Sequence, residues 1–197
     1  MLLPPESDLA LKEWAVAVKS FSAGDQIVVL RKGGIHRDDK DFRIVHPEFL
    51  LYPSYEHQKK DLLKESYHKD LSRVLAQPRS ADSITFSHWA RMEEAIELSD
   101  QEKLDILSPH HIWTEDYAQS RLHWKPSHPL SVMLLRLYRM EQPVTVPYDP
   151  AYSGCTSWVE LSSSVSLGRL TPVLPDEEFR NKVDQVKGLL GLEPARL

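Results

Sequence analysis

The segment LSVMLLRLYRM, residues 130–140, decides whether the second half of the chain is helical or contains a long strand. It lies between Pro129 and Pro143, and its apolar residues could fit either structure. Alternate positions nevertheless form two distinct faces, Val132, Leu134, Arg136 and Tyr138 on one and Met133, Leu135, Leu137 and Arg139 on the other. Because a period of two is typical of a strand, we predict a long strand here rather than a helix.

The rest of the chain alternates between helical and extended patterns. Helical spacing or capping residues predict helices over 8–23, 57–76 and 99–107, after Thr114, and after Pro175. Short apolar or β-branched runs predict strands over 26–32, 42–45, 49–52 and 83–87. The first helix should bury Trp14 and Val18 and expose Lys12, Glu13 and Lys19. The absence of alternating βαβ units indicates an α+β fold, with mixed helices and short strands around one core.

Length and composition indicate a globular protein. Apolar residues make up 41% of the 197 positions and charged residues 27%, close to globular averages. We predict a single domain over residues 1–197, with a subdivision near 77–82 as the alternative. No apolar run is long enough to cross a membrane, so no membrane role is expected.

A cytoplasmic location is expected. Residues 1–25 carry acidic side chains and resemble no signal peptide. The single cysteine, Cys155, cannot form an internal disulfide, which fits a reducing compartment. We predict that Cys155 is a small buried side chain rather than a nucleophile, because its sequence neighbours include no activating base.

Several motifs that carry chemistry are absent. Neither a phosphate-binding glycine loop nor a zinc-ligand spacing occurs, so no cofactor and no metal site are expected. His110 and His111 are adjacent, and neighbouring side chains on a regular element point in different directions. Asp38, Asp39 and Lys40 have the residue types of a metal-dependent nuclease, but they lie in a predicted polar loop.

The candidate catalytic residues are Glu56 and His57. They follow a predicted strand in the segment LLYPSYEHQ, residues 50–58, where a helix is expected to begin. A carboxylate and an imidazole are suited to acid–base catalysis, and such junctions often carry function. Capping of the helix by Ser54 or Glu56 explains the same residues, so both interpretations stay open.

The candidate ligand-binding residues are cations close to aromatic side chains. No acid occurs between Asp116 and Glu141, whereas several cations do. Cations could contact phosphates while aromatic rings stack on bases, although ion pairing with flanking acids is the alternative. The candidates are Arg31, Lys32, Tyr52, Tyr55, Arg121, Trp124, Lys125, Arg136 and Tyr138.

A family resemblance is carried by several separated motifs that occur in order. They are KEWA at 12–15, LRKGGI at 30–35, FLLYP at 49–53, EHQ at 56–58, WKP at 124–126 and GCTSW at 154–158. Together they resemble the bacterial family known as domain of unknown function 1802 over residues 10–165. Some members of that family are joined to a restriction-endonuclease-type region, so the resemblance implies a restriction-associated role near nucleic acid.

The expected elements are also similar to PUA-like barrels with flanking helices, which include the EVE and ASCH domains. Those domains present a pocket or groove to RNA or modified bases, so the similarity implies an RNA-binding or base-binding surface. It is a likeness of fold pattern, and no motif carries it.

These observations favour a non-catalytic binder of nucleic acid or of a nucleotide-like ligand. A net charge of −5 opposes a large duplex footprint. One alternative is a metal-dependent nuclease or other hydrolase centred on Glu56 and His57. Another is a protein-interaction module, because Tyr and Trp serve protein interfaces equally well.

Overall fold

The computed structural model describes residues 3–32, 46–124, 129–154 and 156–193. The strands are β1 Glu6–Trp14, β2 Val28–Lys32, β3 Glu48–Ser54, β4 Ser83–Leu98, β5 Leu130–Pro147, β6 Trp158–Ser166 and β7 Leu170–Pro172. The helices are α1 Ala15–Ala23, α2 His68–Ala76, α3 Gln101–Ile106, α4 Glu115–His123 and α5 Asp176–Leu189, with short 3₁₀ turns at Lys60–Leu62, Glu65–Tyr67, Ser108–His110 and Pro150–Tyr152. The α+β prediction is confirmed.

The long strand β5 organises the sheet. It confirms the strand predicted over residues 130–140 and continues to Pro147, pairing with β4 along nearly its whole length. Every residue from Leu130 to Leu137 is buried, and exposed positions follow. A strand that is covered on both faces is apolar at consecutive positions, which explains why this segment also resembled a helix.

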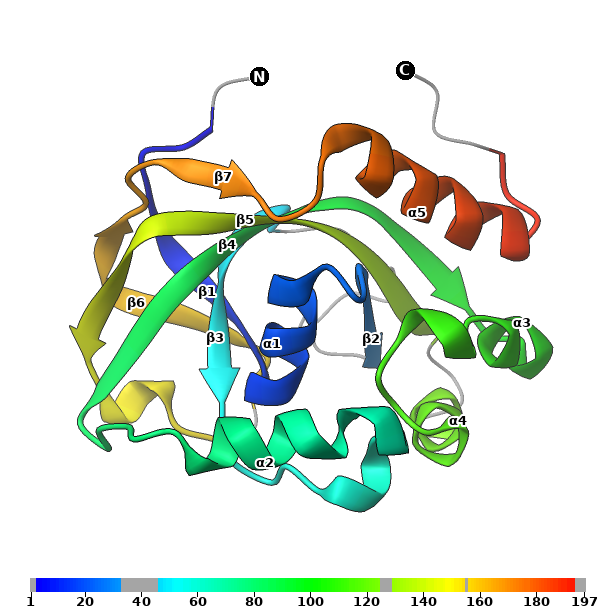
Figure 1. Ribbon diagram of the computed structural model, residues 1–197, viewed down its shortest axis with the longest axis horizontal. Helices are drawn as coiled ribbons and strands as arrows, with labels where there is room; N and C mark the ends of the chain where they lie inside the picture. The colour runs from blue at the N-terminus through cyan, green and yellow to red at the C-terminus, as the bar shows by residue number, and fades with distance from the viewer. Residues whose placement is uncertain (1–2, 33–45, 125–128, 155, 194–197) are drawn as a thin grey trace.

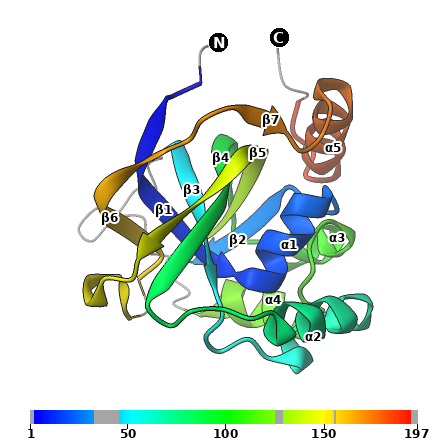
Figure 2. The ribbon, with the colours of Figure 1, turned by 60° about the vertical axis from the view of Figure 1, so that its left-hand side comes forward.

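The sheet is strongly bent. Its strand order is β2-β5-β4-β3-β1-β6, with β7 added beside β5. Figures 1 and 2 show the long strands β4 and β5 sweeping across β1 and β3, with α5 beside β5 and with α2 and α4 at one end of the molecule. The bent sheet and its flanking helices form the mixed α+β architecture, and the PUA-like barrel stays a prediction of the sequence.

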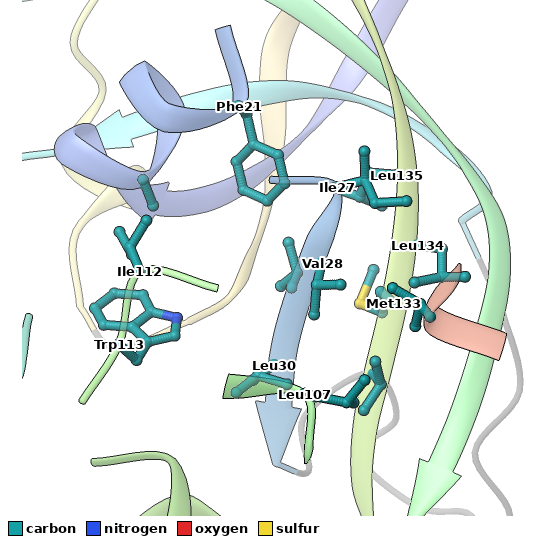
Figure 3. Close-up of a cluster of buried hydrophobic side chains, with 14 of the residues drawn as sticks. Phe21, Ile27, Val28, Leu30, Leu107, Ile112, Trp113, Met133, Leu134 and Leu135 are labelled. Carbon is teal, nitrogen blue, oxygen red and sulfur yellow. The ribbon is translucent and has the colours of Figure 1, made fainter. Parts of the chain in front are cut away.

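Two apolar clusters cover the two faces of the sheet. The larger contains Phe49 and Leu51, and the smaller contains Leu50 and Tyr52, because successive residues of a strand point to opposite faces. Figure 3 shows part of the larger cluster, where side chains from α1, β2, β5 and the chain near Ile112 meet. The expected core is therefore divided by the sheet.

The prediction of a helix over residues 8–23 is wrong for the first half of that segment. Residues Glu6–Trp14 form β1, which lies between β3 and β6, and only Ala15–Ala23 are helical. Pairing on both sides overrides the local helical spacing. Glu13, which was expected to be exposed, is 8% exposed, whereas Trp14 is half-buried and Val18 is buried.

The helix predicted over residues 57–76 begins later than expected. Two 3₁₀ turns precede α2, which starts at His68. Between them Leu63 forms an isolated bridge with Trp113, and the Lys64 N–H donates to the Ile112 carbonyl at 3.0 Å. These long-range bonds hold the chain extended and prevent a continuous helix.

The helices α3, α4 and α5 agree better with the predictions from the sequence. Asp100 caps α3 and Thr114 caps α4, each by accepting backbone N–H bonds. Helix α5 follows Pro175 and carries acids in its first turn, as predicted. The strand predicted over 83–87 is the beginning of the much longer β4, and the strand predicted over 42–45 lies outside the described residues. In the described part of the chain, no helix has the length and apolar character of a membrane span.

Candidate functional site

An arginine bridges β1 and β2, which are not neighbours in the sheet. Arg31 on β2 donates through Nη2 to the carbonyl of Lys12 and to the Glu13 carboxylate, the latter at 2.9 Å. Glu13 also accepts the backbone N–H of Trp14 at 3.0 Å. Both side chains of the ion pair are largely buried, and the pair links β1 to β2.

A cleft of about 1160 Å³ lies beside this ion pair. Its walls come from β1, β2, the start of β6, the end of β3 and helix α4. Four of the five tryptophans of the chain line it. Its aromatic residues are Trp14, His46, His57, Trp113, Tyr117, Trp124 and Trp158, and its basic residues include Lys12, Arg31, Lys32 and Arg121.

Three rings form one aromatic group. Trp14 meets Trp113 edge to face, with ring centroids 5.0 Å apart, and Tyr117 lies 4.9 Å from Trp113. Trp14 stands at the end of β1, whereas Trp113 and Tyr117 lie just before and within α4. The contact between distant segments gives this wall a defined shape.

A second aromatic group surrounds Trp158 at the start of β6. Its ring centroid lies 4.9 Å from that of Phe49 and 5.4 Å from that of His46, both in edge-to-face geometry. Phe49 is fully buried, so it anchors Trp158 to the core. Trp124, just beyond α4, is different because 49% of its surface is exposed.

Both lysines that line the cleft donate hydrogen bonds to backbone carbonyls. Lys12 donates to the carbonyls of Tyr152 and Gly154, the latter at 3.0 Å, and its Nζ lies 5.5 Å from the centre of the Tyr52 ring. Lys32 is buried and donates to the carbonyl of Leu122 near the end of α4. Burial lowers the pKa of Lys32, because the charged form loses hydration.

Arg121 is held differently, by an aromatic ring. Its Nε donates to the Tyr117 hydroxyl at 3.0 Å, and its guanidinium carbon lies 5.3 Å from the centre of the same ring. The two residues are one turn apart on α4, a spacing that places side chains on the same face. The arrangement combines a hydrogen bond with a cation–π contact.

Glu56 and His57 both line the cleft, and both are exposed. His57 has a φ of 57°, the only left-handed backbone at a non-glycine residue in the described part of the chain. Within the described ranges, no group of three or more His, Cys, Asp or Glu side chains is placed to hold a metal ion. Asp38, Asp39 and Lys40 lie outside those ranges, as do Lys125 and Cys155.

Two predicted tyrosines do not line the cleft. Tyr52 is 8% exposed and packs edge to face on Phe86 in the smaller apolar cluster. Burial, with smaller contributions from Tyr148 and Glu56, raises the pKa of its hydroxyl to about 12. Tyr55 is half-buried under the guanidinium of Arg79, which lies 4.6 Å from the ring centre.

Arg136 and Tyr138 also lie away from the cleft. Arg136 is 5% exposed, forms an ion pair with Asp176 at the start of α5, and lies 4.6 Å from the Phe179 ring centre. Tyr138 is on the same strand face, with its ring centre 5.9 Å from the guanidinium carbon of Arg136, and it packs on Trp89. This is the local ion pairing that the sequence left open as the alternative. The cleft therefore brings together Arg31, Lys32, Glu56, His57, Arg121 and Trp124 from the predicted set.

Four further residues line the cleft although they were not among the predicted ligand-binding residues: Lys12, Trp113, Tyr117 and Trp158. A usable signal was present, because Trp113, Tyr117 and Arg121 recur at every fourth position. On α4 that spacing places Tyr117 and Arg121 on one face, and Trp113 lies just before the helix. Trp158 carried no comparable signal, since its place depends on the pairing of β6 with β1.

The family model described as domain of unknown function (DUF1802) matches residues 10–185. The chain belongs to this family. The match confirms the resemblance carried by the sequence motifs. Among curated proteins, none matches the chain.

Solved structures with a distant likeness are ASCH proteins from Zymomonas mobilis. A crystal structure of a mutant ASCH protein is 13% identical, with a TM-score of 0.42, and the match covers 93% of this chain and 99% of that chain. A crystal structure of ASCH is also 13% identical, with a TM-score of 0.41 and coverage of 86% and 89%. No residue role or activity is carried over from these structures.

Proposed function

We propose that the protein binds nucleic acid or a nucleotide-like ligand in the cleft, without carrying out chemistry itself. The observation that carries the proposal is the meeting of aromatic rings and basic side chains in one concave site. Nucleotides need both groups, because bases stack on aromatic faces and phosphates bind cations.

The size and charge of the cleft agree with this proposal. Its volume of about 1160 Å³ exceeds that of most small-molecule sites, which leaves room for more than one nucleotide. Aromatic sites can also bind organic cations. Arg121, which forms no ion pair within the described residues, would repel such a ligand.

The direct test is binding of fluorescein-labelled oligonucleotides followed by anisotropy at low salt. We expect dissociation constants in the micromolar range, accompanied by quenching of the tryptophan fluorescence of the cleft. Trp124→Ala should weaken binding about tenfold, because stacking on an exposed ring is lost. Trp124→Phe keeps an aromatic face and should retain most of the affinity.

The control is Leu189→Ala, which removes an exposed apolar side chain from α5, outside the cleft. It should bind as the wild type does. Absence of binding to RNA, DNA and free nucleotides at tens of micromolar protein would contradict the proposal. That result would leave the protein-interaction module as the better explanation of the aromatic cleft.

A hydrolase centred on Glu56 and His57 is the second candidate, and one observation favours it. His57 combines a position on the cleft with a left-handed backbone, and such backbone outliers cluster at functional sites. Cleavage of labelled RNA or DNA by the purified protein with Mg²⁺ or Mn²⁺, lost in Glu56→Gln, would establish this activity. Intact oligonucleotides after prolonged incubation would support non-catalytic binding.

A further inference from the structure

The basic residues of the cleft differ in what their charged groups already bind. Arg31 is paired with the buried Glu13 carboxylate, so its charge is largely neutralised by the protein. Lys32 donates to the Leu122 carbonyl and is 5% exposed. Lys12 donates to two carbonyls beside the cleft. A count of positive charges therefore overstates the number available to phosphates.

Arg121 is the exception within the described part of the chain. Its Nε bonds to the Tyr117 hydroxyl at 3.0 Å, and no acid or carbonyl there accepts from its terminal nitrogens. The ring beneath the guanidinium, 5.3 Å from its carbon, restricts how the group can turn. A planar guanidinium with two terminal nitrogens matches the geometry of phosphate oxygens.

The rings of the cleft require a particular form of nucleic acid. In a duplex, base faces are covered by neighbouring bases, and only base edges are offered to a protein. Aromatic side chains line the cleft, and among them 49% of the Trp124 surface is exposed, whereas Trp113 is only 6% exposed. The exposed acids Glu56 and Glu160 also border the cleft. These acids and the net charge of −5 oppose the many phosphates of a duplex.

We propose that the cleft takes single-stranded nucleic acid, with unpaired bases on its aromatic rings and one phosphate bound by Arg121, which Tyr117 positions. This inference rests on the proposed function and adds the form of the ligand and its phosphate contact. Stacking then supplies most of the affinity. Salt dependence is consequently shallow, because few counterions are released from the strand.

The test measures anisotropy of one labelled strand of about 12 nucleotides, as RNA and as DNA, alone and annealed to its complement, over a range of salt concentrations. The single strands should bind at least about tenfold more tightly than the duplexes. The slope of log affinity against log salt should be about −0.7, the value for one neutralised phosphate on a single strand.

Two variants separate charge from positioning. Arg121→Gln should weaken binding several-fold and bring the salt slope close to zero. Tyr117→Phe keeps the ring but removes the hydroxyl that holds Nε, so binding should weaken while the slope stays unchanged. Arg180→Gln makes the same charge change on an exposed position of α5 and should match the wild type. Circular dichroism checks that each variant is folded.

Each outcome is decisive. Duplexes that bind as tightly as single strands, or a slope of about −3 or steeper, would overturn the single-strand inference while leaving the proposed function standing. An unchanged slope in Arg121→Gln would remove Arg121 as the phosphate contact. Absence of binding to every probe would instead reject the proposed function itself.

Discussion

Two largely buried arginines on the neighbouring strands β2 and β5 differ in the solvent exposure of their acidic partners. Arg31 on β2 is paired with Glu13, whose side chain is only 8% exposed, and both residues line the large cleft. Arg136 on β5 is itself more deeply buried, but its partner Asp176 is 83% exposed. Arg31 therefore joins two strands beside an open site, whereas Arg136 connects the sheet to the beginning of α5.

The difference shows that an arginine's partner and surroundings decide its role. Arg136 is covered by the Phe179 ring and lies beside Tyr138, and the small cavity next to it measures about 10 Å³. Such a site has no room for a ligand. The charge of Arg31 is also paired with an acid, but the cleft beside Arg31 is large enough for a ligand. The cleft side of the molecule, around Arg31 and Glu13, therefore differs from the β5 side, around Arg136 and Asp176.

The largest effect is expected for Glu13→Ala. Removing the carboxylate leaves the Arg31 guanidinium buried without its acidic partner, which should lower the free energy of unfolding by about 3–5 kcal/mol. Urea denaturation measures it. The matched change on the β5 side is Asp176→Ala, which removes an exposed acid and should cost about 1 kcal/mol or less. Equal losses in the two variants would contradict the comparison.

Two buried histidines, His88 and His111, predict a pH dependence of stability. Burial, followed by repulsion from Lys64, lowers the pKa of His111 from 6.5 to about 4, and burial together with Arg139 does the same for His88. Between those pH values the unfolded chain binds more protons than the folded chain. The free energy of unfolding should therefore fall as the pH decreases from 6.5 to 4, by up to about 3 kcal/mol for each histidine.

Urea titrations at several pH values check this expectation. His88→Gln should remove about half of the histidine contribution, and His111→Gln the other half, because neither histidine contributes to the pKa shift of the other. A variant that leaves the pH dependence unchanged would show that its histidine does not titrate differently on folding.

A smaller effect is expected for Arg136→Met. The apolar chain of Met can occupy the space beside Phe179, and Asp176 stays solvated, so the loss should be about 1–2 kcal/mol. Oligonucleotide affinity should not change, because Arg136 lies outside the cleft. Weakened binding in a folded Arg136→Met protein would mean that the β5 side contributes to the ligand site.

The smallest effect concerns left-handed backbone on the two sides. Gly24, beside Leu174, takes this conformation at the end of α1, whereas on the cleft side His57 does so with a side chain. His57→Gly should be about 1 kcal/mol more stable than His57→Ala, because glycine adopts positive φ without strain. Thermal or urea unfolding measures the difference. Equal stability of the two variants would show that residue 57 changes its backbone freely.

The sequence predicted the β5 strand and the Thr114 cap of α4 because those signals are local, whereas the capping-box pattern began the α3 helix at Ser99, one residue before the observed cap Asp100. It did not predict β1, because residues 6–14 become a strand only through pairing with β3 and β6. The change from strand to helix at Trp14 has no side-chain cap that could mark it. Glu13 was predicted to be exposed because residues 8–23 were predicted to be one helix. In the structure Glu13 is part of β1, where it pairs with Arg31.

The candidate site was predicted in part. Arg31, Lys32, Arg121 and Trp124 were selected from charge and aromatic content, and they line the cleft. The same criteria also selected Arg136, which is buried under α5. Local sequence cannot distinguish these cases, because burial and ion pairing are set by elements far along the chain.

The position of β1 in the sheet has a consequence for biosynthesis. β1 occurs early in the chain, yet one of its neighbours, β6, is residues Trp158–Ser166. During synthesis, an edge of β1 stays unpaired while most of the chain is made, and exposed strand edges favour association between molecules. Because Trp158 is also part of the cleft, the binding surface cannot be complete before this late segment has emerged and paired.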